Sequence, residues 1–190
     1  MNHHSHGKHD KGKVSYLESP ERRKVLSPER LLNMIPLKEN DSMLDFGAGT
    51  GYFSIPAAKR INGSVYALDI DAAMLEIINE KALEEQVTNI VPVLGSMEAL
   101  PSNSSIDIII ASLVLHEIQP LAPLLEQMKN VLKKEGYLIC LELEPKKSSG
   151  KAPRISMEGM EREMKEAGFT VTEKSFPASS LYMLIAQRTE

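Results

Sequence analysis

Short apolar runs alternate along the chain with longer segments whose apolar residues recur at helical spacing. The short runs predict strands, because turn residues such as Asn62-Gly63 separate them from their neighbours. Residues 106–112 hold four isoleucines, which is typical of a strand buried on both faces. The strands predicted in this way are 43–46, 64–68, 90–94, 106–112, 136–143, 169–175 and 181–187.

The segments with helical spacing carry start and stop signals. Ser19-Pro20 and Ser27-Pro28 each place a capping hydroxyl before a proline at the first helical position. Pro36 and Gly168 each follow a predicted helix, and both residue types end helices. The predicted helices are 20–26, 28–35, 52–60, 72–86, 121–132 and 157–167.

This alternation predicts an α/β fold, in which right-handed crossovers give a mostly parallel sheet with helices on both faces. The 190 residues are 42% hydrophobic and 25% charged, which fits one globular domain. We expect that domain to span residues 37–190. Ligands of such sheets bind beyond the carboxyl ends of the strands.

A glycine-rich loop follows the first predicted strand. It reads Asp45-Phe46-Gly47-Ala48-Gly49-Thr50-Gly51, with three glycines at alternate positions. The dinucleotide fingerprint GxGxxG lets the backbone approach a pyrophosphate, whereas here the third glycine comes one residue early. Asp45 would repel a diphosphate and suits a ligand with a cationic amino group. The loop therefore favours S-adenosylmethionine over NAD.

Four ordered pieces of the sequence resemble the class I S-adenosylmethionine-dependent methyltransferases, especially the small-molecule branch that includes the ubiquinone/menaquinone-type enzymes. The resemblance runs from about residue 37 to the C-terminus. It implies a Rossmann-like fold whose last strand is antiparallel, and a helical leader at 16–36 that caps the active site. The pieces are MLDFGAGTGYF at 43–53, VYALDID at 65–71, GSMEALP at 95–101 and IDIIIASLVLHEI at 106–118.

These pieces supply the expected cofactor site for S-adenosylmethionine, with S-adenosylhomocysteine as product. The Asp69 carboxylate can accept both ribose hydroxyl protons, whereas Asp71 precedes a predicted helix and is the better cap. Ser96 stands where the family often carries an aspartate near the adenine, which leaves that contact to Met97. The expected cofactor-binding residues are Asp45, Gly47, Ala48, Gly49, Thr50, Gly51, Asp69, Ile70, Met74, Ser96, Met97, Glu98, Ala111, Ser112 and Leu113.

The acceptor side carries fewer signals. His116 is the candidate catalytic base, because an unperturbed imidazole titrates near pH ~6.5; alternatively, it packs on its loop and bonds the backbone. Tyr16 is the candidate substrate-binding residue, or an ordinary packing tyrosine. The segment 111–114 reads Ala-Ser-Leu-Val and lacks the Pro-Pro tetrapeptide of enzymes that methylate amino groups of adenine, cytosine or glutamine.

Composition excludes several partners. Cys140 is the only cysteine, so a thiol-rich metal site cannot form. Residues 1–30 hold seven Lys/Arg against four Asp/Glu and so carry a charge of +3. Because the whole chain has a net charge of −4, residues 31–190 carry −7. An acidic domain of this kind disfavours binding to nucleic acid. We expect no membrane span and a cytoplasmic protein, since no apolar run reaches about 18 residues. We expect residues 1–15 to be a His- and Lys-rich flexible tail. This tail could chelate a metal, although we favour no metal role.

We therefore predict a methyltransferase that transfers the methyl group to a small-molecule acceptor by in-line displacement, as a monomer or homodimer. Holding two reactants together can supply up to ~7–11 kcal/mol of the barrier, so no side-chain nucleophile is required. Two alternatives remain: a catalytically silent cofactor-binding regulatory module and a nucleotide-dependent oxidoreductase. Whether carbon, nitrogen, oxygen or sulfur is methylated stays open.

Overall fold

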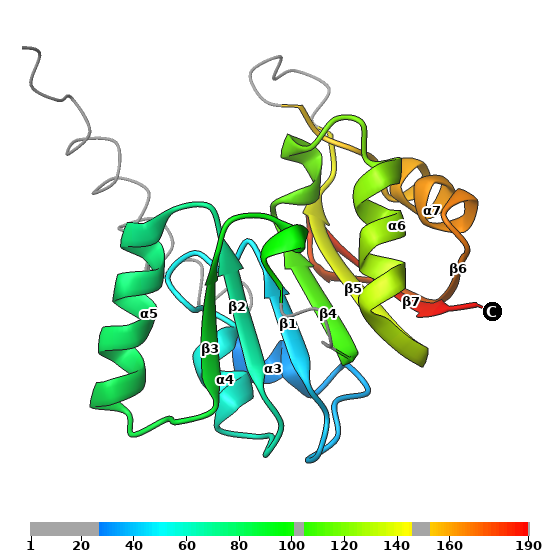
Figure 1. Cartoon of the computed structure of the whole chain (residues 1–190). Coiled ribbons are helices and arrows are strands. Elements are labelled where there is room, and N and C mark those ends of the chain that lie inside the picture. The colour runs from blue at the N-terminus through cyan, green and yellow to red at the C-terminus, as the bar shows by residue number, and fades with distance from the viewer. Residues whose placement is uncertain (1–26, 101–104, 146–152, 190) are drawn as a thin grey trace, which may run out of the picture.

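The computed structural model describes residues 27–100, 105–145 and 153–189, which form one seven-stranded sheet with helices on both faces (Figure 1). The strand order is β3-β2-β1-β4-β5-β7-β6, and every pairing is parallel except the two made by β7. This confirms the predicted Rossmann-like sheet with an antiparallel last strand. The strands are β1 (Met43–Phe46), β2 (Val65–Asp69), β3 (Ile90–Leu94), β4 (Ile106–Ser112), β5 (Leu132–Leu143), β6 (Phe169–Ala178) and β7 (Leu181–Arg188).

The helices begin at the polar caps that the sequence marks. The Ser27 hydroxyl accepts a hydrogen bond from the Arg30 amide at 3.0 Å, and the Asp71 carboxylate accepts one from the Ala73 amide at 3.0 Å. The capping role predicted for Asp71 is therefore confirmed. The helices are α3 (Pro28–Leu32), α4 (Ser54–Ala58), α5 (Ala72–Glu84), α6 (Ala122–Val131) and α7 (Met157–Glu166), with 3-10 helices η1 (Met97–Ala99) and η2 (Leu115–Glu117).

The sheet is apolar on both faces. In β4, Ile108 and Ile110 pack with α3 and α4, whereas Ile109 and Ala111 pack on the opposite face with α6 and α7. All four side chains are at most 1% exposed, as expected for a central strand covered on both sides. Because helices cover both faces of the sheet, a ligand can reach the central strands only at their ends.

Some predicted boundaries are wrong. The helix predicted over 52–60 is only α4, because the chain still turns through residues 51–53 after Gly51, whose φ is +82°. The helix predicted over 28–35 ends at Leu32, where the chain turns toward Pro36. Strand β5 begins four residues earlier than predicted, because Leu132 already pairs with Ile106 of β4. The register of the two strands shifts between this pair and the next one, at Ile108.

Several predictions fall outside the described residues. These are the tail at 1–15, Tyr16 and the leader helix at 20–26. Within the described ranges, none of the helices combines the length and the apolar character needed to cross a bilayer. The same ranges contain no group of three or more metal-ligating side chains.

Candidate functional site

A cavity of about 570 Å³ opens at the carboxyl ends of the central strands. This is where open α/β sheets bind their ligands, and the volume is that of a small-molecule site. Its lining comes from the end of β1 and the glycine loop, the end of β2, and the loops after β3 and β4. The lining residues are Asp45, Phe46, Gly47, Ala48, Gly49, Thr50, Tyr52, Phe53, Leu68, Asp69, Ile70, Gly95, Ser96, Met97, Ser112, Leu113, Val114, Glu117, Ile118, Pro120, Pro123, Leu124 and Gln127.

The glycine loop adopts a backbone that only glycine takes readily. Gly47 and Gly51 have φ values of +71° and +82°. A Cβ on Gly47 would also lie 2.8 Å from Val114 Cγ2, and one on Gly51 would lie 3.0 Å from Ile78 Cγ1. Gly47 thus allows contact with the loop after β4, whereas Gly51 allows α5 to approach from behind.

Hydrogen bonds hold the loop in place. The Gly47 and Ala48 amides donate to the Leu68 carbonyl at 2.9 and 3.0 Å. The Gly49 amide donates to Asp69 Oδ2 at 2.8 Å, and Lys81 Nζ donates to the Thr50 carbonyl at 2.8 Å. These bonds order the loop without a ligand, which reduces the entropy lost on binding.

Two buried carboxylates line the cavity beside this loop. Asp45 is 2% exposed, and its Oδ2 accepts a hydrogen bond from the Ser54 hydroxyl at 2.6 Å. Asp69 is 7% exposed, and its Oδ1 accepts a hydrogen bond from the Asp71 amide at 3.0 Å. The negative charge favours a cationic ligand group. Ser54 was not predicted, although its place at the start of α4 is where hydroxyls often bond nearby polar groups.

The loop after β4 carries a strained residue at the cavity. Leu113 has a φ of +57°, which is unusual for a residue with a branched side chain. Its amide donates to the Leu141 carbonyl of β5 at 2.8 Å, which helps to hold this backbone. Such strain clusters at ligand sites, and here it turns Leu113 and Val114 into the cavity lining.

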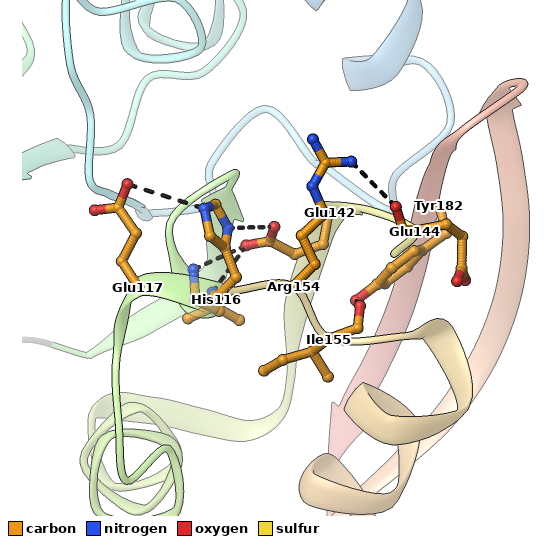
Figure 2. A network of polar contacts seen from close by, with 8 residues as sticks. His116, Glu117, Glu142, Glu144, Arg154, Ile155 and Tyr182 are labelled. Atoms are coloured by element: carbon orange, nitrogen blue, oxygen red, sulfur yellow. Dashed lines mark hydrogen bonds and ion pairs between the residues drawn. The ribbon is translucent and has the colours of Figure 1, made fainter. Parts of the chain in front are cut away.

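His116 lies in η2, next to this lining, and pairs with Glu142 from the end of β5 (Figure 2). Its Nδ1 lies 2.7 Å from Glu142 Oε2, so the ring bonds a carboxylate instead of the backbone. Glu142 is 1% exposed; burial raises its pKa, and the imidazole and the Leu115 and His116 amides act in the opposite direction. No local sequence signal predicts this pairing, because 26 residues separate the partners.

The structure brings most of the predicted cofactor residues to this cavity, but not all of them. Gly51, Met74 and Ala111 lie behind the lining, because Gly51 faces Ile78 and the other two are fully buried. Glu98 is exposed on η1 and His116 lies beside the lining. The predicted residues that do line it are Asp45, Gly47, Ala48, Gly49, Thr50, Asp69, Ile70, Ser96, Met97, Ser112 and Leu113.

Sequence reasoning missed the apolar part of the lining. Tyr52 and Phe53 follow directly after Gly51, so their place in the same motif was an available signal. Ile118, Pro123 and Leu124 lie in or before α6, where only the packing of that helix on the sheet places them at the cavity. This apolar surface can cover the uncharged parts of a ligand.

Comparison with known proteins identifies the family. A methyltransferase domain matches residues 37–179. The chain belongs to this methyltransferase family. A S-adenosylmethionine-dependent methyltransferase from Aquifex aeolicus has a similar structure, with a TM-score of 0.83 and 25% sequence identity over 94% of this chain and 98% of that chain. The family and the fold therefore indicate S-adenosylmethionine as the cofactor, as the glycine loop did.

Relatives of this methyltransferase act on different acceptors. The malonyl-(acyl-carrier protein) O-methyltransferase of Marinomonas is 32% identical over 77% of this chain and 53% of its own length. A ubiquinone/menaquinone biosynthesis C-methyltransferase of Neisseria meningitidis is 33% identical over 58% of this chain and 46% of its own length. The chain thus spans about half the length of these curated relatives. The cyclase SpnF has the same fold, with a TM-score of 0.77 at 14% identity over 90% of this chain and 82% of that chain.

The cavity fits the cofactor in its chemistry. Asp45 and Asp69 are buried carboxylates that line the cavity, and such groups would suit the cationic part and the ribose hydroxyls of S-adenosylmethionine. Ile70 is 83% exposed although it is a large apolar residue, and it borders the same cavity. An adenine ring would remove such a surface from water.

Proposed function

We propose that this methyltransferase transfers a methyl group from S-adenosylmethionine to a small-molecule acceptor by in-line displacement. The observation that carries the proposal is one cavity of about 570 Å³ that joins the ordered glycine loop and its two carboxylates to an apolar lining. The carboxylates suit the cofactor, and the apolar lining suits an uncharged organic acceptor next to it. The names of the quinone-pathway relatives agree with this acceptor class, whereas other relatives are named for malonyl-(acyl-carrier protein) and for ribosomal protein L11.

The cofactor-binding roles are assigned to residues of the lining. Asp45 would orient the amino group, with Ser54 holding its carboxylate, and Asp69 would accept from the ribose hydroxyls. Ile70 and Leu113 would cover the adenosine. The bound cofactor supplies an electrophilic methyl group on a sulfonium, so the protein needs only to orient the acceptor toward it.

Covalent catalysis through the cysteine is not part of the proposal. Cys140 is fully buried in β5 and packs in the core with α6 and α7. Burial, followed by the charge of Glu142, holds the pKa of this thiol well above its ordinary value, so it stays protonated. It serves as a small core residue.

Calorimetric titration with S-adenosylmethionine, and separately with S-adenosylhomocysteine, tests the cofactor site. We expect both to bind with micromolar dissociation constants. A panel of phenols, thiols, amines and carboxylic acids, assayed by S-adenosylhomocysteine release, then tests methyl transfer. Cofactor binding without transfer to any compound would favour the silent regulatory module. The cyclase SpnF shares the fold, so the fold alone does not establish methyl transfer. Binding of neither compound would contradict the proposal.

Four further features remain predictions that belong to this proposal. The helical leader at 16–36 would cap the acceptor side, with Tyr16 against the substrate. The protein would act as a monomer or homodimer, without nucleic acid, in the cytoplasm. Removal of residues 1–15 tests the tail: unchanged cofactor affinity and turnover would support its lack of a role.

A further inference from the structure

Both carboxylate oxygens of Glu142 form hydrogen bonds with the loop that carries His116. Glu142 Oε1 accepts from the Leu115 amide at 2.8 Å and from the His116 amide at 3.4 Å, and Oε2 lies 2.7 Å from His116 Nδ1. One buried side chain therefore fixes both the backbone of η2 and the imidazole ring (Figure 2). A side chain held at both its backbone and its ring has few other orientations.

The opposite edge of the ring faces the cavity side of the loop. His116 Nε2 lies 3.9 Å from Glu117 Oε1, and Glu117 lines the cavity. Val114 and Ile118, on either side of η2, line it as well. The His116 side chain lies beside this lining and is 17% exposed.

We propose that Glu142 is a positioning residue that keeps the proton of His116 on Nδ1, so that Nε2 accepts a proton from the methyl acceptor. This inference rests on the proposed function and narrows its acceptor class to groups that become good nucleophiles only on losing a proton: a hydroxyl, a thiol or an acidic C–H. The acceptor atom forms its bond to the methyl carbon as the methyl–sulfur bond breaks, and the proton of the acceptor moves to Nε2. The imidazolium then releases this proton to water.

Two acidic side chains flank the imidazole ring. Glu142 from β5 and Glu117 from η2 face the two ring nitrogens, at 2.7 Å from Nδ1 and 3.9 Å from Nε2. Arg154, in the segment before α7, directs its Nη1 to the Glu144 carbonyl at 3.1 Å. Cys140 of β5 and Tyr182 of β7 are the other titratable groups beside Glu142; burial raises the pKa of both, so they add no charge at neutral pH.

Glutamine at position 142 gives a sharp test. In Glu142→Gln the amide oxygen can still accept from the Leu115 amide, whereas the amide nitrogen must donate to Nδ1. The imidazole proton then moves to Nε2, which can no longer accept a proton. Nitrogen-15 NMR distinguishes the two tautomers, and His116 is the only histidine after residue 9, so a His116→Asn variant assigns its signals.

We expect the neutral imidazole to carry its proton on Nδ1 in the wild-type protein and on Nε2 in Glu142→Gln. Glu144→Gln is the matched control, because this carboxylate lies two residues along β5 and bonds the Met157 amide instead of the imidazole. It should leave the His116 tautomer unchanged. If the wild-type imidazole carries its proton on Nε2, the proposal is overturned. The wild-type tautomer can be measured without a known acceptor and does not depend on the folding of Glu142→Gln.

Turnover gives the second readout. On phenols or thiols that are protonated at the assay pH, Glu142→Gln and His116→Asn should each lower kcat by about 10²–10⁴-fold, the usual contribution of general base catalysis. The dissociation constant for S-adenosylmethionine should not change. On acceptors of the same series that are already ionised, both variants should lose little activity. Equal losses on both kinds of acceptor would overturn the proton-transfer role, whereas absence of turnover with every acceptor would contradict the proposed function and leave the tautomer result intact.

Discussion

Gly47 and Val114 lie so close together that a single added methyl group on Gly47 would come within 2.8 Å of Val114 Cγ2. The two residues belong to different loops, which follow β1 and β4. The parallel pairing of Phe46 with Ala111 brings these loops side by side. Contact between them closes one side of the cofactor cavity, since both residues line it.

Gly47→Ala should disturb this contact and strain the backbone. Its φ of +71° costs an alanine of order 1–3 kcal/mol, and the clash adds to that cost. We expect a lower free energy of unfolding and weaker S-adenosylmethionine binding, measured by urea denaturation and calorimetry. Adding Val114→Ala removes the clash but not the strain, so the double variant should recover part of the loss. Strictly additive losses would contradict the contact.

Asp69→Ala and Asp71→Ala separate a binding role from a capping role on neighbouring carboxylates. Asp69→Ala should weaken S-adenosylmethionine binding by about 1.5–3 kcal/mol, because a charge-assisted hydrogen bond is lost and the Gly49 amide loses its partner. Asp71→Ala should cost about 1 kcal/mol of stability through loss of the α5 cap, with cofactor affinity retained. Calorimetry and denaturation of both variants check this. Unchanged affinity in Asp69→Ala would remove Asp69 from the site.

Cys140 should make the protein less stable as the pH rises. The native thiol stays protonated because its pKa is held well above the ordinary value, whereas the unfolded thiol ionises above about pH 8.5. The native state then binds the extra proton, and the free energy of unfolding should fall by up to about 1.4 kcal/mol per pH unit above that point. Urea denaturation of wild type and Cys140→Ala across this range isolates the effect. Parallel pH profiles of the two proteins would contradict it.

Tyr182 ties the sheet to the segment that leads into α7. Its hydroxyl donates to the Ile155 carbonyl at 2.9 Å, and burial raises its pKa, so the proton needed for donation is retained. Tyr182→Phe should therefore lower the free energy of unfolding by about 1 kcal/mol. Tyr66→Phe is the control, because the described residues offer its hydroxyl no hydrogen bond. Similar losses in both variants would show that the Tyr182 bond contributes nothing specific.

Local sequence signals determined the order of elements and half of the site. Apolar runs bounded by turn residues gave β1, β3 and β4 with the observed bounds. The glycine loop indicated the cofactor. The position of Asp71 before a helix predicted its capping role, which left Asp69 as the candidate for cofactor binding. These features depend on residues near each other in the chain, where backbone sterics and hydrogen-bonding chemistry act directly.

Only the tertiary structure decided which side chains point into the core and which residues of different strands contact each other. Ala111 and Met74 were expected to bind the cofactor, yet both are buried in the core, because strand pleat and helix packing set the direction of each side chain. The pairing of His116 with Glu142 depends on β4 and β5 lying side by side, with Ser112 next to Leu141. The sequence by itself determined which residues could bind or react; which of them meet depends on strand register, because register is set by the packing of the whole sheet.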